Sequence, residues 1–482
     1  MLKSNIAWMK KNVPSDLKVW KGMIQDIDWS QVAAKTKLSL QRDKDRITAE
    51  FKEFAAMDTS AKIDWLMNGD RHLGYLYKKD AIAFARREWK GLKSVGYDFV
   101  GWLKIWGGML NMVMKDPVSI MLAVFEYHWF ASYLATPAVV DRSVFGRRGK
   151  LLQADFDMWV AITHWAEDLI ANLIMADAKI GGNQKINKRI IMFDEMTMAQ
   201  MMAGFPNLLG IPYQMIPVFM VSEMDQLTLI PYIDAIESYG LPSDTCPLPT
   251  AECGCAVKDE YPMCGQGFIA SSMPCDGSVM ATSFQDRRFS KFMPSYPLCM
   301  PVRYDDEDTT EMAAADMKDC IHWVEGLTGE TWNWDTYFAT MEKMNECTRL
   351  EMEKWEINKT HYPQLVGSSF ELFRKWNYEM DGGLFPEGLK TQRKICKTMM
   401  ETYEKKLPAY VGGYEKYRAL IWSCPAHFYA NFSNWLANCW GIYALTEMEA
   451  LNMTKMLNTT DKEEAINDLC RLYERMVMRR HT

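Results

Sequence analysis

The amino-acid sequence predicts an α/β protein with a helical N-terminal region, a parallel-sheet unit, and a second unit that is apparently incomplete. Three observations predict this organisation. Residues 1–150 place apolar positions at helical spacing, and short apolar runs alternate with helical stretches from residue 188 onward. Another such run begins at residue 417, with only about 65 residues left after it. We therefore expect three parts, 1–150, 151–410 and 411–482.

The composition is that of an ordinary globular protein. Of the 482 residues, 48% are hydrophobic and 24% are charged, which excludes a disordered or collagen-like chain. The formal net charge of −7 argues against a nucleic-acid partner, because proteins of that class need a basic face. The 37 Met and 18 Trp residues are typical of a soft, aromatic-rich core.

The first boundary is predicted at residues 145–150 (FGRRGK), a polar break that contains glycine. Before it, residues 117–140 are long enough to cross a bilayer. This segment carries Glu126 and His128 near its centre, where ionisable groups are costly. We therefore expect a buried or interface helix and no membrane span. After the boundary, residues 151–180 are predicted to form one long helix.

Short apolar runs predict the first parallel sheet. Residues 188–195 (KRIIMFDE) have the pattern of a buried strand that ends in acids. Residues 214–221 contain Pro217 and predict an irregular or edge strand at best. Residues 225–239 are expected to be helical, and residues 267–271 form a further short apolar run that ends in a turn.

Helices dominate the next part of the sequence. Residues 310–354 are predicted as a helical stretch broken by a turn at 328–329, and residues 392–406 as another helix. Residues 417–423 (YRALIWS) again have the pattern of a buried strand, and this strand would open the second unit.

Cysteine is distributed unevenly along the chain. The first 245 residues contain none, and the N-terminus lacks the pattern of a signal peptide. Five cysteines then fall within the segment from Cys246 to Cys275, which in a cytoplasmic protein indicates metal or redox chemistry more than disulfides. Five later cysteines lie in helical patterns and are expected to be buried, inert thiols: Cys320, Cys347, Cys396, Cys439 and Cys470.

Cys246 and Cys275 are the most informative pair. Cys246 follows a predicted helix and precedes Pro247, while Cys275 follows a predicted strand and turn. We expect both at the carboxyl ends of strands, the edge where open α/β sheets bind ligands. Thiolates at that edge could hold an iron–sulfur cluster.

The sequence resembles the family of 2-hydroxyacyl-CoA dehydratase and benzoyl-CoA reductase D-component-like proteins. The resemblance covers roughly residues 150–482 and rests on elements that occur in a fixed order. They are IIMFDEMTMAQMMAGF (190–205), LPSDTCP (241–247), SSMPCDGS (271–278), PLCMPVRYDDED (297–308), WVEGLTGETWNWDTYFATMEKMNE (323–346) and RALIWSCPAHFYAN (418–431).

The resemblance implies two Rossmann-like domains after a helical N-terminal part, in a subunit that pairs with a second homologous subunit. It also implies a [4Fe-4S] cluster, an ATP-dependent activator protein that delivers one electron, and an acyl-CoA substrate. The activity would be dehydration of a 2-hydroxyacyl-CoA or reduction of an aromatic acyl-CoA. Dehydration needs an electron because the proton at C3 is not acidic enough for a protein base to remove. The cofactor therefore supplies the one-electron chemistry.

Cys246 and Cys275 match the first two ligand elements of the family. The family's third ligand lies late in the second domain, and the sequence ends before that element. We therefore expect a truncated chain, a substitute cysteine, or a protein without a normal cluster. Cys424, after the strand that opens the second unit, is one candidate substitute. Another is a thiolate loop formed by Cys253, Cys255 and Cys264.

Other side chains are candidates for supporting roles. Ser271 and Ser272 could hydrogen-bond to cluster sulfur or substrate, although ordinary turn serines are the simpler interpretation. Glu195, after the first strand, is a candidate acid–base group or an acid favoured at a helix N-terminus. Arg287 and Arg288 could contact CoA phosphates or form a solvated helix face.

Two further interpretations remain open. The chain could be a non-catalytic partner subunit of the same fold, which would associate with a second subunit and hold no cluster. It could also be an electron carrier, whose cluster would be reduced without CoA binding. The choice of acyl-CoA is set by the shape of the cleft, which the sequence does not specify.

Overall fold

The computed structural model describes residues 29–68, 91–136, 140, 149–180, 189–194, 199–224, 227–272, 275–301, 306–367, 376, 381–407, 409–410, 415–421, 432, 436–447 and 455–474. The chain divides into two compact units. The first consists of Met1–Asp70 and Glu88–Gly96, and the second of Arg71–Arg87 and Tyr97–Thr482.

The described part of the first unit is helical, as the spacing of apolar residues predicts. It contains α2 (Trp29–Ala56) and α3 (Thr59–Asn68). The Asp58 carboxylate caps the start of α3 by accepting a hydrogen bond from the backbone N–H of Ala61 at 2.8 Å. The rings of Phe54 and Trp65 lie 4.8 Å apart and hold the two helices together.

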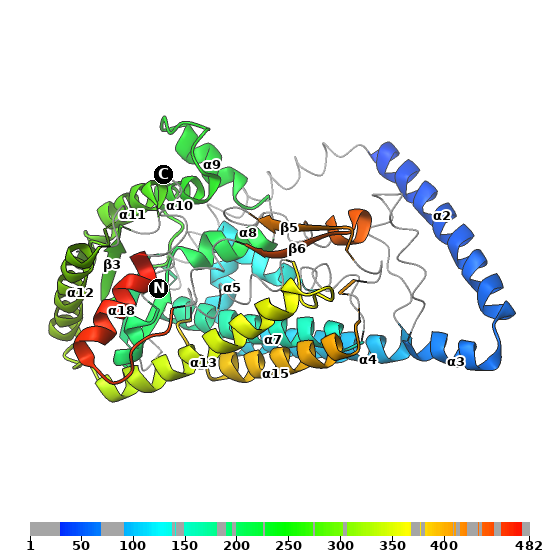
Figure 1. The fold of residues 1–482 in the computed structure, drawn as a ribbon. Coiled ribbons are helices and arrows are strands. Elements are labelled where there is room, and N and C mark those ends of the chain that lie inside the picture. Colours follow the sequence, from blue (N-terminus) through cyan, green and yellow to red (C-terminus); the bar gives the residue numbers. More distant parts are fainter. Residues whose placement is uncertain are drawn as a thin grey trace. The chain divides into compact units, whose positions relative to one another are not determined.

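The second unit combines helices with two parallel sheets (Figure 1). Its α-helices are α4 (Gly91–Lys115, which begins in the first unit), α5 (Pro117–Glu126), α7 (Gly149–Ala176), α8 (Met220–Met224), α9 (Ile230–Glu237), α10 (Pro247–Val257), α11 (Asp276–Phe289), α12 (Glu307–Thr328), α13 (Trp334–Lys359), α15 (Pro386–Glu404) and α18 (Lys462–Glu474). Short 3₁₀ or π turns are η3 (His128–Ala135), η4 (Met201–Gly204), η5 (Met215–Phe219) and η7 (Leu436–Trp440). The strands are β1 (Arg189–Phe193), β2 (Leu208–Pro212), β3 (Gly267–Ser271), β4 (Ser295–Leu298), β5 (Tyr417–Ile421) and β6 (Ile442–Glu447).

The larger sheet has four parallel strands in the order β2-β1-β3-β4. The chain first adds β2 on one side of β1, then crosses back to add β3 and β4 on the other side. The strand order therefore reverses between β1 and β3, and open α/β sheets bind ligands in the crevice at the carboxyl ends of such strands. The smaller sheet pairs β5 with β6, also in parallel. The predicted α/β class with parallel sheets is confirmed, and the Rossmann-like character of the domains stays a prediction.

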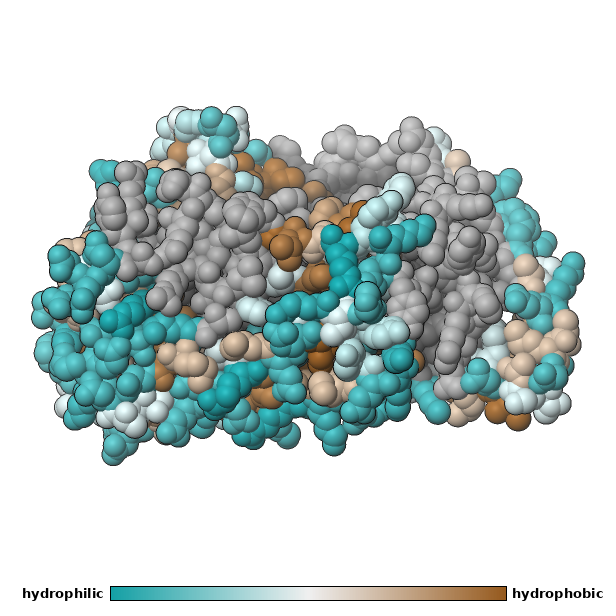
Figure 2. Space-filling model, in the orientation of Figure 1, coloured by the Kyte–Doolittle hydropathy of each residue, from teal (hydrophilic) through white to brown (hydrophobic). Residues whose placement is uncertain are grey.

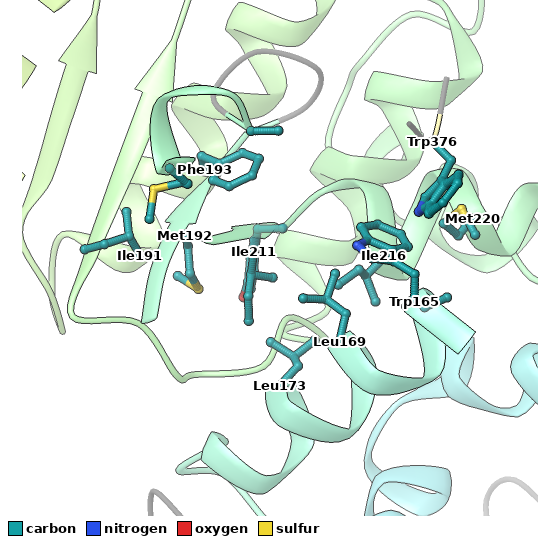
Figure 3. Close-up of a cluster of buried hydrophobic side chains, with 14 of the residues drawn as sticks. Trp165, Leu169, Leu173, Ile191, Met192, Phe193, Ile211, Ile216, Met220 and Trp376 are labelled. Atoms are coloured by element: carbon teal, nitrogen blue, oxygen red, sulfur yellow. The ribbon is translucent and has the colours of Figure 1, made fainter. Parts of the chain in front are cut away.

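One face of the larger sheet is covered by α7. Figure 3 shows Trp165, Leu169 and Leu173 of this helix pointing toward the buried side chains around β1 and β2. Such side chains occur at helical spacing along α7, so burying them drives the helix onto the sheet. Helices α13 and α15 run alongside α7, and hydrophilic side chains dominate the face over α12, α13 and α15 (Figures 1 and 2).

Most elements agree with the sequence prediction, but one predicted strand does not form and another is exposed where burial was predicted. Residues 214–221 form the turn η5 and the helix α8, because Pro217 has no N–H to offer a sheet. The true second strand is β2, whose Gly210 lies where a Cβ would meet Met202 and Phe193 at 2.6 and 2.9 Å. Residues 417–421 do form a strand, but an exposed one, because it lies in a two-stranded sheet.

The apolar segment at 117–140 does not form one helix. It contains α5 and η3, separated by a break at Tyr127, and the side chains of Tyr127, Trp129 and Phe130 are fully buried. Within the described ranges, no single helix is long and apolar enough to cross a membrane, although α4 and α5 meet that test as a pair bent by 98°.

Helices α9 and α10 meet at Gly254. A Cβ at this position would collide with the backbone of Tyr232 on α9, so only glycine lets the two helices approach this closely. Tyr232 is itself fixed by a hydrogen bond that its hydroxyl donates to Glu260 at 2.6 Å. The contact sets the position of α10, which begins directly after Cys246.

Substituting Gly254→Ala is expected to lower the free energy of unfolding by about 1–3 kcal/mol, because the added methyl group meets backbone that cannot move aside. Gly326→Ala is the matched control, since its Cβ would have open space on α12. It should stabilise the protein by up to about 1 kcal/mol through helix propensity. Urea unfolding followed by circular dichroism measures both, and equal midpoints for the two variants would contradict the account of this contact.

Glu167 on α7 is a buried carboxyl group beside α4. Its side chain lies against Gly108, where any Cβ would overlap it. Burial raises the pKa of Glu167 to about 8, and Lys115 opposes this only in part. The folded protein therefore keeps the proton at pH values where the unfolded chain has lost it, so this group lowers stability as the pH rises from about 4.5 to about 8.

Glu167→Gln should therefore stabilise the protein at pH 9 by roughly 2–4 kcal/mol more than at pH 5, because a glutamine needs no proton to stay neutral. Asp168→Asn on the same helix is the control, because Asp168 is exposed and pairs with Lys115. Unfolding curves at the two pH values give the difference. If Glu167→Gln changed the free energy of unfolding by the same amount at both pH values, the raised pKa of Glu167 would be refuted.

Candidate functional site at the carboxyl edge of the sheet

The site begins with a buried carboxylate at the reversal point of the sheet. Asp194 follows β1 and is fully buried. Its carboxylate accepts hydrogen bonds from the backbone N–H of Ser271 at 2.5 Å and from the Ser271 hydroxyl at 3.0 Å. Ser271 ends β3, so these two bonds join the carboxyl ends of the two strands between which the strand order reverses. A buried carboxylate needs such partners to offset the loss of water.

The contacts of Asp194 continue into α11 and β2 through buried polar side chains. The Thr282 hydroxyl on α11 donates to Asp194 at 3.3 Å, and Gln214 donates to Thr282 at 3.4 Å and to Gln285 at 2.9 Å. Gln285 in turn donates to the Tyr261 hydroxyl at 2.9 Å. This buried polar network therefore fixes α11 to the ends of β1, β2 and β3.

Ser272 clamps the loop after β3 to the loop after β4. Its hydroxyl donates to the carbonyl oxygen of Met300 at 2.7 Å and accepts from the Met300 N–H at 2.8 Å. Cys299, the first residue after β4, is exposed beside this clamp, and its N–H donates to Asp316 at 2.6 Å. The loops that carry Cys275 and Cys299 are thus held at one edge.

Cys246 and Cys275 each cap the N-terminus of a helix, α10 and α11 respectively. The two first turns touch: a Cβ at Gly277 would lie 2.8 Å from Pro249 and 3.6 Å from the sulfur of Cys275. Cys246 is exposed and Cys275 is half-buried. The fold therefore brings the two cysteines to the same end of one helix pair.

Helices α10 and α11 run parallel, because they touch at corresponding points along their lengths. Cys253 packs with Ala281 in their middle, and Asp259, just after α10, forms an ion pair with Arg288 near the end of α11. Both N-termini therefore point toward the cysteine end, where their backbone dipoles favour negative charge. Thiolates gain from this environment, and so do anionic ligands.

Several sequence predictions are corrected by this geometry. Cys246 follows α9 and two turns, not a strand, and reaches the edge only because α10 packs on α11. Arg287 and Arg288 lie at the opposite end of α11 from Cys275, where Arg287 is exposed and Arg288 pairs with Asp259. The exposed position of Arg287 agrees with the solvated helix face that the sequence favours, and a contact with CoA phosphates stays a prediction.

The proposed thiolate loop of Cys253, Cys255 and Cys264 is also wrong. Cys253 and Cys255 lie within α10 and are fully buried. Burial, with Glu252 nearby, raises the pKa of Cys253 to about 12, and burial raises the pKa values of Cys255 and Cys264 well above the ordinary range. The predicted loop is therefore not formed, because two of its three cysteines lie inside a packed helix and the described residues include no group of three metal-ligating side chains.

The later cysteines are buried, as predicted, at Cys320, Cys347, Cys396 and Cys470. Two of the candidate residues lie outside the described residues, namely Glu195 and Cys424, and so does the side chain of Cys439. Among the residues that the structure describes, no group of three His, Cys, Asp or Glu side chains could hold a metal ion. The thiols of Cys246, Cys275 and Cys299 at the described edge thus do not form such a group.

A separate cavity of about 360 Å³ lies beside the edge strand β2. It is lined by residues of α7, η4, β2 and α13 and by the segment 381–385, and its lining does not include Cys246 or Cys275. Asp381 in this lining is buried, and burial raises its pKa to about 7. Its carboxylate accepts the backbone N–H of Phe385 at 2.9 Å and so orders the turn before α15.

Sequence reasoning missed Asp194 at this edge, and it ranked Cys299, in a loop flanked by proline, below the other candidate cysteines. Asp194 is the buried residue that links the strand ends, whereas its neighbour Glu195 was the one predicted. The available signal was position: Asp194 is the first polar residue after an apolar strand, and parallel strands place such residues at the ligand edge. Cys299 follows β4 in the same way as Ser272 follows β3.

A family model described as 2-hydroxyglutaryl-CoA dehydratase, D-component, matches residues 226–481, more than half of the chain. The chain belongs to this family. The matched region starts just before α9 and contains Cys246, Ser271, Ser272 and Cys275, whereas β1 and β2 precede it. No curated protein shows significant similarity to the chain. Membership in the dehydratase D-component family therefore rests on the part of the chain that carries both cysteines.

Ser271→Ala is expected to lower the free energy of unfolding by about 1–3 kcal/mol, because it removes a buried hydrogen bond to a carboxylate. The control is Ser283→Ala on α11, whose hydroxyl donates to Val279 at an exposed position, with an effect within about 0.5 kcal/mol. Guanidinium unfolding of the two variants provides the comparison. If the two substitutions changed the free energy of unfolding equally, the bond between Asp194 and Ser271 would not stabilise this edge.

Proposed function

We propose that this chain is the iron–sulfur subunit of a radical-type 2-hydroxyacyl-CoA dehydratase or of a related acyl-CoA reductase. The observation that carries the proposal is the convergence of Cys246 and Cys275 at the N-termini of two packed, parallel helices. Family membership supports the dehydratase class. The proposal includes a second homologous subunit, an ATP-dependent activator and a cytoplasmic location.

Cys246 and Cys275 would hold a [4Fe-4S] cluster as thiolates, with Cys424 as a candidate further ligand. When bound, such a cluster supplies one-electron transfer and a Lewis-acidic iron. The remaining contribution comes from the protein. The aligned helix N-termini stabilise the negative charge of the thiolates, and half-burial of Cys275 restricts the approach of water.

Ser271 and Ser272 act in this proposal by positioning the loop that carries Cys275. Their hydroxyls are engaged with Asp194 and Met300, so they hold the loop in place between β3 and α11. This arrangement resembles the outer hydrogen bonds that orient ligands in metal sites generally. Glu195 remains the candidate proton donor or acceptor near the end of β1.

A second candidate function is a non-catalytic partner subunit of the same enzyme class. It is favoured by one observation, namely that the described residues include no group of three metal-ligating side chains. This subunit would associate with a homologous, cluster-bearing chain and hold no iron itself. The electron carrier with a Cys253, Cys255 and Cys264 site is disfavoured because Cys253 and Cys255 are fully buried inside α10 and form no three-ligand group among the described residues.

Iron and acid-labile sulfide in anaerobically purified full-length protein separate these functions. The wild type should contain both, and Cys246→Ser and Cys275→Ser should each lower the iron content by at least about half, since each removes a thiolate ligand. Cys320→Ala is the control, because this thiol is fully buried within α12. It should leave the iron content unchanged.

Folded, iron-free wild-type protein would refute the cluster-bearing role and favour the partner subunit. Iron that survives both cysteine substitutions would refute the assigned ligands while leaving the family membership intact.

A further inference from the structure

Helices α4 and α5, which meet at a bend of 98°, both carry exposed apolar side chains within the second unit. On α4 the exposed positions recur at steps of three or four residues, which places them on one side of the helix. Leu110 is 62% exposed, Met114 65% and Val118 69%. The surface, called here the α4–α5 stripe, consists of Phe99, Val100, Leu103, Trp106, Leu110, Met114, Val118 and Met121.

The other side of α4 is already used for packing. Ile105 and Met112 are buried, and glycines at 101 and 108 bring the helix against Phe156 and Glu167 of α7. The helix is therefore apolar on the side that faces α7 and on the side that carries the stripe. An apolar side of a helix that is exposed in this way is expected to have a partner.

The size of the stripe fits a specific protein interface. Large apolar side chains that are about half exposed contribute on the order of 100 Å² each, so the eight present about 800 Å². That is the area each partner buries in an interface of standard size. Lone exposed apolar residues need no explanation, but eight of them on two successive helices do.

The charges around the stripe favour a protein partner over a lipid surface. Helices that lie on membranes carry many Lys and Arg beside their apolar face. Between Phe99 and Met121 the sequence contains three charged residues, Lys104, Lys115 and Asp116. Lys115 forms an ion pair with Asp168, and Asp116 caps α5 through Ser119 at 3.2 Å, so Lys104 alone is left to contact lipid headgroups.

The stripe is also complementary to itself. Gly107 sits at its centre, next to Trp106, with open space where a side chain would be. Leu103 and Leu110 are equidistant along the helix from the point between Trp106 and Gly107, and Phe99 and Met114 are equidistant from the same point. An antiparallel pair of α4 helices with its twofold axis at that point would place each Trp106 over the notch at Gly107 of the other copy.

We propose that the α4–α5 stripe joins two copies of this chain in a twofold-symmetric dimer through antiparallel α4 helices. A twofold interface uses the same patch on both copies, so it must supply both the projection and the notch that receives it. Trp106 and Gly107 meet this requirement. The proposal is independent of the enzymatic function.

The first test is the mass of the full-length protein in solution at about 20 µM, measured by light scattering after size exclusion. The wild type is expected at twice the chain mass of 55.8 kDa. Gly107→Glu should weaken dimerisation at least 10-fold and give monomer. Gly326→Glu is the matched control, because Gly326 is an exposed helical glycine on α12 with the same open space, and it should stay dimeric.

The second test examines the register by exchanging charges. Leu103→Glu and Leu110→Lys should each disrupt the dimer, while the double variant should restore it, because position 103 faces position 110 of the other copy. Recovery in the double variant supports the antiparallel pairing, and its failure overturns that pairing.

A monomeric wild type overturns the proposal, as does a Gly107→Glu variant that dimerises like wild type. The same samples are sedimented with phosphatidylcholine vesicles. Monomeric protein that binds these vesicles through the stripe would assign the surface to a membrane and also overturn the proposal.

Discussion

The buried link between Asp194 and Ser271 is the interaction on which the rest of the candidate site depends. It joins the ends of β1 and β3, the two strands between which the order of the sheet reverses. A carboxylate removed from water must keep its donors, so the loop after β3 cannot move away from β1 without a large cost. That loop leads directly to Cys275, and the position of this thiol therefore follows from the position of Asp194.

The position of Cys275 in turn determines that of Cys246 through the packing of helices. Gly277 allows α11 to approach Pro249, and Gly254 allows α10 to approach Tyr232. The first contact brings Cys246 to the edge where Cys275 lies, and the second fixes α10 from its other side. Two glycines and one buried carboxylate thus bring the two cysteines to the same end of the helix pair, although Cys246 does not follow a strand. The helix dipoles then add electrostatic stabilisation at the end where both sulfurs lie.

The sequence predicted the elements whose patterns arise from simple burial. β1, β3, α7, α12, α13 and α15 all agree with their apolar periodicity, because each buries one face or both in the core. β2 was missed because it contains Gly210 and Pro212, which are unusual in a strand. The glycine is needed because a Cβ would meet Met202 and Phe193, and these contacts form only in the folded protein. Residues 214–221 are apolar because Ile216, Val218 and Val221 are buried, which the periodicity could not distinguish from a strand.

The candidate site was predictable only in part for a similar reason. Cys275 follows a strand, so the general rule for parallel sheets places it at the ligand edge. Cys246 follows a helix, and only the packing of α10 on α11 places it there. Glu195 was preferred to Asp194 because both acids follow the same apolar run, and burial of one of them is decided by Ser271 and Thr282, which lie far along the chain.

The strand order also has a consequence for how the chain folds. β1 bonds to β2, which follows soon after it, and to β3, which is separated from it by η5, α8, α9 and α10. During synthesis β1 therefore keeps one open, apolar edge until β3 leaves the ribosome. Such long-range parallel pairing is slow to form, so the nascent protein is most exposed to aggregation in the interval between these two strands.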